Sequence, residues 1–255
     1  MAIDEAQVTA ALKTLTDPNT GRDYIATRSA RNIKVTVSDV SLDVELGYPA
    51  KTQLEPLRKQ ITECLRAVHG CGAVTVNMTM KIVAHSVQRG VKLIPGVKNI
   101  IAVASGKGGV GKSTTAVNLA LALAAEGAQV GILDADIYGP SQPRLLGLSG
   151  AQQKTEGKKL IPQEAHGIKA MSMGFMVEEE TPIVWRGPMV VQALNQMLRE
   201  VMWGDLDVLI IDMPPGTGDV QLTMAQQAPI AGAVIVSTPQ DLALIDARKG
   251  LAMFR

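Results

Sequence analysis

"SGKGGVGKST", residues 105–114, is the stretch that decides the fold of this chain. Gly106 to Ser113 fit the pattern G-x-x-x-x-G-K-[ST], after the apolar run "IIAVAS" and before the Ala- and Leu-rich run "TTAVNLALALAAEG". This pattern in this context indicates a loop between a buried strand and a helix. Its glycines let backbone N–H groups turn toward phosphate oxygens at the helix N-terminus. The sequence therefore predicts a nucleotide phosphate site.

The residues of this loop have expected roles. Lys112 is expected to meet the β- and γ-phosphates, and the Ser113 hydroxyl is expected to bind Mg²⁺. Lys107 is one lysine more than a phosphate loop needs. The predicted nucleotide-binding residues are Gly106, Lys107, Gly108, Gly109, Val110, Gly111, Lys112, Ser113 and Thr114.

Three further apolar runs are typical of strands buried on both faces: "AQVGILD" (128–134), "DVLIIDMPP" (207–215) and "GAVIVST" (232–238). The stretches between them are long enough for helices. This order predicts an α/β fold, a P-loop NTPase domain with a mostly parallel sheet covered on both sides. The chain stops at Arg255 inside a helical pattern, so we expect this domain to be truncated at its C-terminus.

Carboxylates follow two of these runs. Asp212 ends "DVLII" and is expected to hold Mg²⁺, usually through water. Asp134 and Asp136 in "ILDADIYGPS" are expected at the same sheet edge, one near the metal and one holding the attacking water. The alternative is that these two acids cap the helix that follows. The segment "PPGTGD" (214–219) is either a switch that moves with the γ-phosphate or a rigid turn.

The first 85 residues carry another pattern. "VSLDVEL" (40–46) and "VTVNMTMKI" (74–82) alternate strictly, which is typical of strands with one buried face. Apolar residues recur at helical spacing between them, and "DEAQVTAALKTL" (4–15) predicts another helix. We therefore expect a small α+β domain at 1–85 and the P-loop domain at 99–255. Between them, residues 86–98 contain Pro and Gly and no strong periodicity, so we expect a linker there.

Composition narrows the class of protein. With 25 basic and 24 acidic residues, the net charge of +1 gives no reason to expect a bulk binder of nucleic acid or of an anionic membrane. The N-terminus does not read as a secretory signal, so the expected location is cytoplasmic. The two cysteines, Cys64 and Cys71, do not form a Cys-x-x-Cys pair, and we interpret them as free structural thiols rather than cluster ligands.

Four motifs together resemble one family. "KGGVGKST" with its early lysine, "LDADIYGPS", "WRGP" (185–188) and "DMPPGTGDVQL" are similar to the Mrp/ApbC branch of the deviant Walker A P-loop ATPases. Members of this branch are iron–sulfur cluster carrier or scaffold proteins, related to septum-site and plasmid-partition ATPases. The resemblance covers residues 96–255. The first 85 residues resemble, less specifically, the MIP18-like (DUF59) domain.

The resemblance implies a homodimer that hydrolyses ATP slowly with Mg²⁺, and it implies roles for single residues. Lys107 would reach the partner subunit's phosphates, and Asp136 would orient the water, so the expected catalytic residues are Lys107, Lys112 and Asp136. Ser113, Asp134 and Asp212 would serve the magnesium. The expected switch residues are Asp134, Asp136, Gly216 and Asp219.

One departure from the family pattern concerns the cluster itself. Family members hold a bridging [4Fe–4S] cluster with a Cys-x-x-Cys pair further along, and this chain has no such pair. A cluster is therefore expected only if a segment carrying that pair is present. Expected partners are apo iron–sulfur proteins and cluster assembly factors, with no nucleic acid and no membrane. A spatial-partitioning switch and a non-catalytic adaptor remain as alternatives.

Overall fold

The computed structural model describes residues 3–85, 87, 90–176 and 187–254. The chain divides into two compact units, Met1–Val83 and Ala84–Arg255. Residues 86–98, expected to be a linker, are counted with the second unit, together with residues 84 and 85. Ile94 is buried in the core of that unit, and its first strand begins at Val97.

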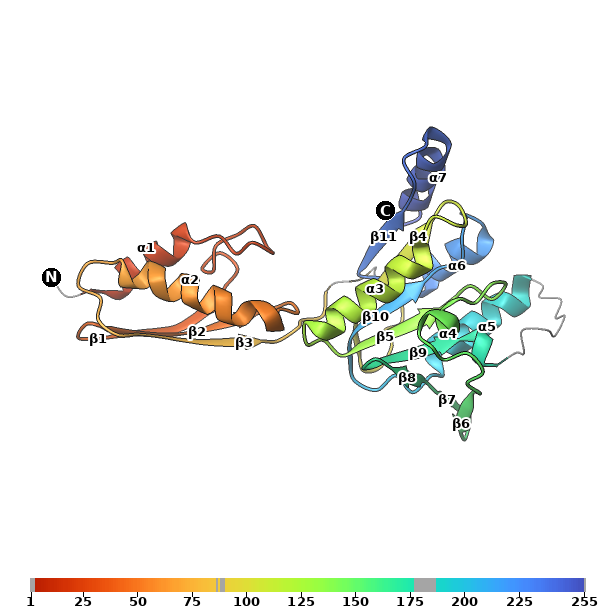
Figure 1. Cartoon of the computed structure of the whole chain (residues 1–255), viewed down its shortest axis with the longest axis horizontal. Coiled ribbons are helices and arrows are strands. Elements are labelled where there is room, and N and C mark those ends of the chain that lie inside the picture. The colour runs from red at the N-terminus through yellow and green to blue at the C-terminus, as the bar shows by residue number, and fades with distance from the viewer. Residues whose placement is uncertain (1–2, 86, 88–89, 177–186, 255) are drawn as a thin grey trace. The chain divides into compact units, whose positions relative to one another are not determined.

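The first unit is a three-stranded sheet with two helices on one face (Figure 1). The strands lie in the order β1-β2-β3, with β1 antiparallel and β3 parallel to β2. Every second residue of β2 from Val40 to Leu46 is buried, as the alternation predicts, and these side chains pack against Val8, Leu12 and Ile61 of the helices. The elements are α1 (Glu5–Thr14), β1 (Ala30–Thr36), β2 (Asp39–Leu46), η1 (Lys51–Gln53), α2 (Leu54–Arg66) and β3 (Val74–Met80).

The second unit has a six-stranded sheet in the order β11-β4-β10-β5-β9-β8. Neighbouring strands are parallel except β8, which is antiparallel to β9, so the prediction of a mostly parallel sheet is confirmed. A separate hairpin pairs β6 with β7. The strands are β4 (Val97–Ser105), β5 (Val130–Asp134), β6 (Lys154–Glu156), β7 (Lys159–Ile161), β8 (Gln163–Ala165), β9 (Ile168–Ser172), β10 (Leu206–Asp212) and β11 (Gly232–Val236).

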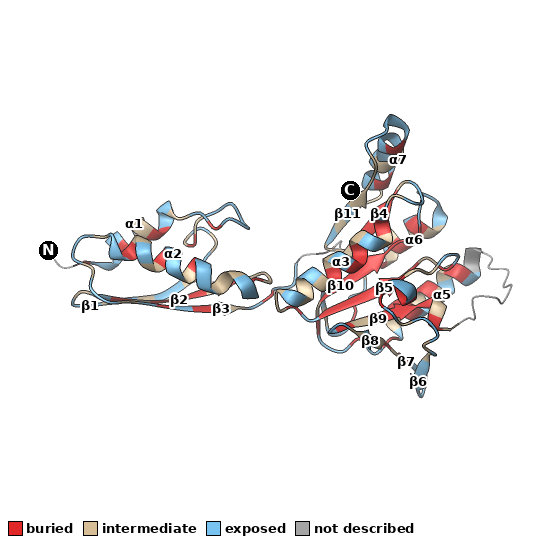
Figure 2. Cartoon of the chain, in the orientation of Figure 1, coloured by how far each residue is buried: buried red, intermediate tan, exposed pale blue. Residues whose placement is uncertain are grey.

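Helices cover this sheet on both faces (Figure 1). Leu209 and Ile211 of β10 belong to the core cluster that contains side chains of α5 and α6, while α3 packs against β4, β5 and β10 from the other face. Figure 2 shows the central strands buried, whereas the edge strand β11 and α7 are largely exposed or half-buried. The helical elements are α3 (Lys112–Ala125), α4 (Gln142–Leu145), η2 (Met173–Phe175), α5 (Gly187–Arg199), α6 (Asp219–Gln227) and α7 (Asp241–Ala252).

The strand β9 has no counterpart in the sequence prediction. It is short and carries Lys169 near its centre, which interrupts the apolar run. The Lys169 ammonium group donates a hydrogen bond to the main-chain oxygen of Trp203 at 2.7 Å, so this charge is satisfied beside the core. The strand matters because Ser172 at its end is paired in register with Asp134 of β5. None of the helices in the described part of the chain combines the length and apolarity needed to span a bilayer.

Candidate nucleotide site

The parallel strands bring their carboxyl ends to one edge of the sheet. Asp212 of β10 is in register with Asp134 of β5, and both are the last residues of their strands. The strand β4 runs on to Ser105 beside them, and the loop quoted above follows. This edge is the place where open α/β sheets bind ligands.

The loop has the backbone that its glycines predict. Gly109 and Gly111 have φ angles of 76° and 88°, in the left-handed region that favours glycine. The helix α3 begins directly afterwards at Lys112, so its free N–H groups face the loop. The predicted nucleotide-binding residues 106–114 therefore form one continuous loop and first helical turn.

Lys112 lies at the centre of the site and is only 6% exposed. Its ammonium nitrogen is 2.5 Å from Asp212 Oδ1 and 3.1 Å from Ser113 Oγ. The structure thus brings together three of the predicted residues: the phosphate lysine and the two proposed magnesium ligands on β10 and α3. In this arrangement the lysine provides the positive charge that the two oxygens face.

The second oxygen of Asp212 is held by a residue outside the sequence motifs that predict the site. Gln142, the first residue of α4, donates from Nε2 to Asp212 Oδ2 at 2.8 Å and to the main-chain oxygen of Ser113 at 3.1 Å. Both carboxylate oxygens of Asp212 therefore have fixed partners, one from the loop side and one from α4.

Asp134 is fully buried and receives four hydrogen bonds. The backbone N–H groups of Asp136, Ser141 and Gln142 and the hydroxyl of Ser172 donate to it at 2.9 to 3.2 Å. Burial raises the pKa of Asp134 to about 7; the hydrogen bond from the backbone of Gln142 lowers it, and the nearby charge of Asp212 raises it further. Two of the donors, Ser141 and Gln142, open α4, so Asp134 holds the start of that helix.

The other switch candidates lie around this centre. Asp136 is half-buried, and its Oδ1 accepts a hydrogen bond from the Gly139 backbone at 3.2 Å. Gly216 has a φ of 99° and donates its N–H to the main-chain oxygen of Ser105 at 2.9 Å, which ties the loop after β10 to the start of the phosphate loop. Asp219 is exposed and is the first residue of α6.

Lys107 is partly exposed and pairs with a residue of α7. Its ammonium nitrogen is 3.8 Å from Asp246 Oδ2 on α7, and the two side chains are 43% and 32% exposed. The same helix packs closely on the loop, because a Cβ placed on Gly106 would lie 2.6 Å from the main-chain carbon of Asp246. The early lysine is therefore accessible at the rim of the site.

The oxygens at this edge suit Mg²⁺. Hard divalent cations of this size take oxygen ligands, usually one or two carboxylates plus phosphates. Ser113 Oγ and Asp212 Oδ1 already face a positive group, the Lys112 ammonium. Two nearby buried oxygens, Ser141 Oγ and Gln142 Oε1, have no hydrogen-bond partner in the described part of the chain.

Thiolate ligands are not gathered in the described part of the chain. No group of three or more His, Cys, Asp or Glu side chains is placed there to hold a metal ion by itself. Cys64 and Cys71 are free and half-buried in the first unit. The predicted motif "WRGP" starts at Trp185 and Arg186, which lie outside the described residues; Gly187 and Pro188 open α5.

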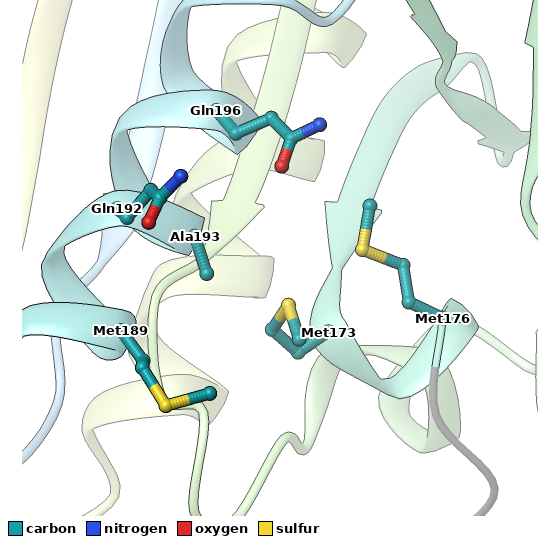
Figure 3. Close-up of a pocket in the computed structure, with 6 residues that line it drawn as sticks. All are labelled: Met173, Met176, Met189, Gln192, Ala193 and Gln196. Carbon is teal, nitrogen blue, oxygen red and sulfur yellow. The ribbon is translucent and has the colours of Figure 1, made fainter. Parts of the chain in front are cut away.

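A pocket of about 280 Å³ lies between η2 and α5 (Figure 3). Its described lining is methionine, glutamine and alanine, without a charged side chain: Met173, Met176, Met189, Gln192, Ala193 and Gln196. Such a lining offers soft, adaptable contacts rather than phosphate contacts. The pocket is therefore distinct from the phosphate loop, although Met173 directly follows Ser172 of the site.

Comparison with known proteins agrees with this geometry. Residues 96–255 match the family described as NUBPL iron-transfer P-loop NTPase, and residues 5–78 match the family described as iron-sulfur cluster assembly protein. A nucleotide-binding protein from Archaeoglobus fulgidus, solved in complex with ADP, superposes with a TM-score of 0.54 at 44% identity, over 62% of this chain and 61% of that one.

Two curated relatives carry the name iron-sulfur cluster carrier protein. The one from Pseudomonas fragi is 60% identical over 73% of this chain, and the one from Escherichia coli K12 is 52% identical over 85%. The chain spans 66% and 59% of these relatives' own lengths. The family match over residues 96–255 confirms the resemblance noted in the four motifs, and the chain belongs to the NUBPL iron-transfer family of P-loop NTPases.

Proposed function

We propose that this protein is an ATP-binding and ATP-hydrolysing carrier that transfers iron–sulfur clusters to apoproteins, acting as a homodimer in the cytoplasm. The observation that carries the proposal is the contact of buried Lys112 with half-buried Ser113 in the phosphate loop and with buried Asp212 at the end of β10. This contact occurs in a chain of the iron-transfer P-loop family. The relatives that bear the carrier name are the second support.

The phosphates of ATP would be bound by the N–H groups of the loop and the start of α3. Gly109 and Gly111 supply the left-handed backbone that turns these groups inward. Lys112 is already at the site, and it would exchange Asp212 for the β- and γ-phosphate oxygens when nucleotide arrives. Nucleotide binding would thus replace the carboxylate partner of Lys112 by phosphate, while the lysine charge stays buried.

Ser113 and Asp212 would hold Mg²⁺, with Asp134 behind them. When bound, Mg²⁺ would neutralise charge on the β- and γ-phosphates. Asp134 already accepts four hydrogen bonds, so its part is to keep the carboxylate pair and the start of α4 in place. Asp212 is the carboxylate with an oxygen facing the loop.

Hydrolysis would need a positioned water and a second subunit. We assign the water to Asp136, which is half-buried at the same edge. Lys107 would come from the facing subunit to stabilise the charge that develops on the phosphate. In the single chain this lysine is at the rim, against Asp246. A site that is complete only in the dimer would make turnover by the single chain slow.

The cargo would be a [4Fe–4S] cluster held by thiolates. Cys64 and Cys71 are not proposed as its ligands, because they do not form a Cys-x-x-Cys pair and are free, half-buried thiols. The ligands would come from a Cys-x-x-Cys segment where the polypeptide carries one. The expected recipients are apo iron–sulfur proteins, with assembly factors as donors.

The two alternatives make different predictions. A spatial-partitioning switch is not favoured, because the family matched over residues 96–255 is the iron-transfer one. A non-catalytic adaptor would bind ATP through the same loop without turning it over. Intact ATP binding with undetectable hydrolysis by the dimer would favour the adaptor.

The decisive experiment is anaerobic reconstitution with iron and sulfide. It is performed on the 255-residue chain and on any longer product of its gene, and it is read by visible absorbance, iron content and transfer to an apo [4Fe–4S] protein. Cluster on the longer product alone would assign the ligands to the additional segment. Absence of transferable cluster from every form would overturn the carrier function.

A further inference from the structure

Gln142 joins three elements of the candidate site through its buried side chain and its backbone N–H. It is 1% exposed. Its backbone N–H donates to Asp134 Oδ2 of β5, while its Nε2 group donates to Asp212 Oδ2 of β10 and to the main-chain oxygen of Ser113 on α3. In the sequence, Ser113 and Asp212 are 29 and 70 residues away from Gln142.

The orientation of this amide follows from its partners. A carboxylate oxygen and a main-chain oxygen only accept hydrogen bonds, so the NH₂ group and not the oxygen must face them. Gln142 Oε1 is consequently left buried without a partner in the described part of the chain. A buried acceptor in that state is costly, and native proteins keep few of them.

Asp212 depends on this amide when the nucleotide binds. In the present arrangement Lys112 holds Oδ1 and Gln142 holds Oδ2, so each oxygen of the carboxylate has a partner that favours this orientation. If Lys112 moves to the phosphates, the hydrogen bond from Gln142 remains. Within the described part of the chain, this side-chain contact would then hold the Asp212 carboxylate in place. The bond to Ser113 fixes the first turn of α3 at the same time.

We propose that Gln142 is a positioning residue for magnesium: its amide holds the Asp212 carboxylate and the Ser113 turn in the arrangement that accepts Mg²⁺ together with a nucleoside diphosphate or triphosphate. The inference rests on the proposed nucleotide-binding function of this site. It assigns Gln142 no contact with phosphate, so binding of nucleotide without metal should not need it.

Gln153 provides a matched control. It is also a glutamine whose Nε2 donates to two main-chain oxygens, of Lys154 and Ile161, and whose Oε1 is buried without a partner in the described part of the chain. It lies beside the hairpin of β6 and β7 and does not touch a carboxylate through these bonds. A buried, unpartnered amide oxygen is thus common to both residues, and the contact with Asp212 distinguishes Gln142.

The test measures the dissociation constant of a fluorescent ADP analogue in EDTA and in excess Mg²⁺, for the whole chain and for Gln142→Met and Gln153→Met. Methionine has nearly the same length as glutamine but does not donate a hydrogen bond. We expect Gln142→Met to reduce the Mg²⁺-dependent gain in affinity by about tenfold, while affinity in EDTA changes by less than about threefold. Gln153→Met should leave both values unchanged.

Each outcome decides the matter. An unchanged Mg²⁺-dependent gain in a folded Gln142→Met protein would overturn the inference, and so would an equal loss of affinity with and without Mg²⁺. If the unaltered chain binds no nucleotide in either condition, the proposed function fails and the inference fails with it. If Gln142→Met does not fold, Gln142→Asn takes its place, because its shorter amide cannot reach both acceptors.

Discussion

Lys112 Nζ lies 2.5 Å from Asp212 Oδ1, and the two side chains are only 7% and 0% exposed. The pair is therefore a buried one, formed between the first residue of α3 and the last residue of β10. A buried pair differs from a surface pair because each partner left alone is a charge without water.

The first prediction follows from this burial. Lys112→Met should destabilise the second unit by about 3 kcal/mol, because it leaves the Asp212 carboxylate buried beside Gln142 alone. Asp212→Asn should cost a similar amount, and the double variant should cost clearly less than the sum. Denaturant unfolding followed by tryptophan fluorescence measures this, since Trp203 is buried in the core of the second unit. Strictly additive costs would contradict the coupling.

The second prediction concerns Gly106 and α7. A Cβ on Gly106 would lie 2.6 Å from the main-chain carbon and the Cβ of Asp246, so Gly106→Ala must push α7 away from the loop. We expect a loss of about 1–3 kcal/mol and faster hydrogen exchange along residues 241–252. Gly108→Ala is the control, because a Cβ there meets no atom within 4 Å. Equal exchange of α7 in both variants would refute the close packing.

The phosphate loop could be predicted because all of its information is local. Strand, glycines, lysine and helix follow one another in ten residues, and the structure places them in that order. The meeting of Asp134 and Asp212 was also predictable, since parallel strands end at one edge. The strand register places these two residues opposite each other on neighbouring strands.

The rest of the site depends on strand order, which the sequence pattern does not contain. Gln142 directly follows the motif "DIYGPS" (136–141). Its hydrogen bond to Asp212 nevertheless exists only because β5 lies next to β10 in the sheet. Ser172 belongs to β9, a strand interrupted by Lys169 and therefore not recognised. Asp246 pairs with Lys107 because α7 packs on the phosphate loop, and nothing in the loop motif predicts this packing.

The third prediction concerns the first unit at alkaline pH. Tyr24 is fully buried, and burial, followed by the charge of Asp17, raises its pKa from 10.0 to about 12. The unfolded chain loses this proton near pH 10 while the folded chain keeps it. Stability due to Tyr24 is therefore intact below about pH 10 and is lost as pH rises toward about 12.

Tyr24→Phe tests this linkage. The variant should lose less stability between about pH 9 and about pH 11 than the unaltered chain, although Tyr48, whose pKa is also raised by burial, keeps part of the effect. At neutral pH it should be more stable by about 1 kcal/mol, because the Tyr24 hydroxyl has no partner in the described part of the chain. Guanidinium unfolding followed by circular dichroism measures both.

Tyr138→Phe, at a position 68% exposed in the other unit, is the control, and an identical pH response of the two variants would contradict the assignment.

The last prediction concerns Lys107 and the second subunit. Its pair with Asp246 is 3.8 Å long and half exposed, and such pairs contribute at most about 1 kcal/mol, so the lysine can leave Asp246 at little cost. Lys107→Ala should reduce the ATPase rate by about a hundredfold while leaving ADP affinity of the single chain unchanged, because Lys112 remains in its own loop. The rate per chain of the unaltered protein should also rise with protein concentration, and that of Lys107→Ala should not.

Lys249→Ala is the matched control, since Lys249 also pairs with Asp246, at 3.5 Å, from an exposed position on α7. Full activity in Lys107→Ala would remove the role across the dimer, and the early lysine would then be a surface residue that only pairs with α7.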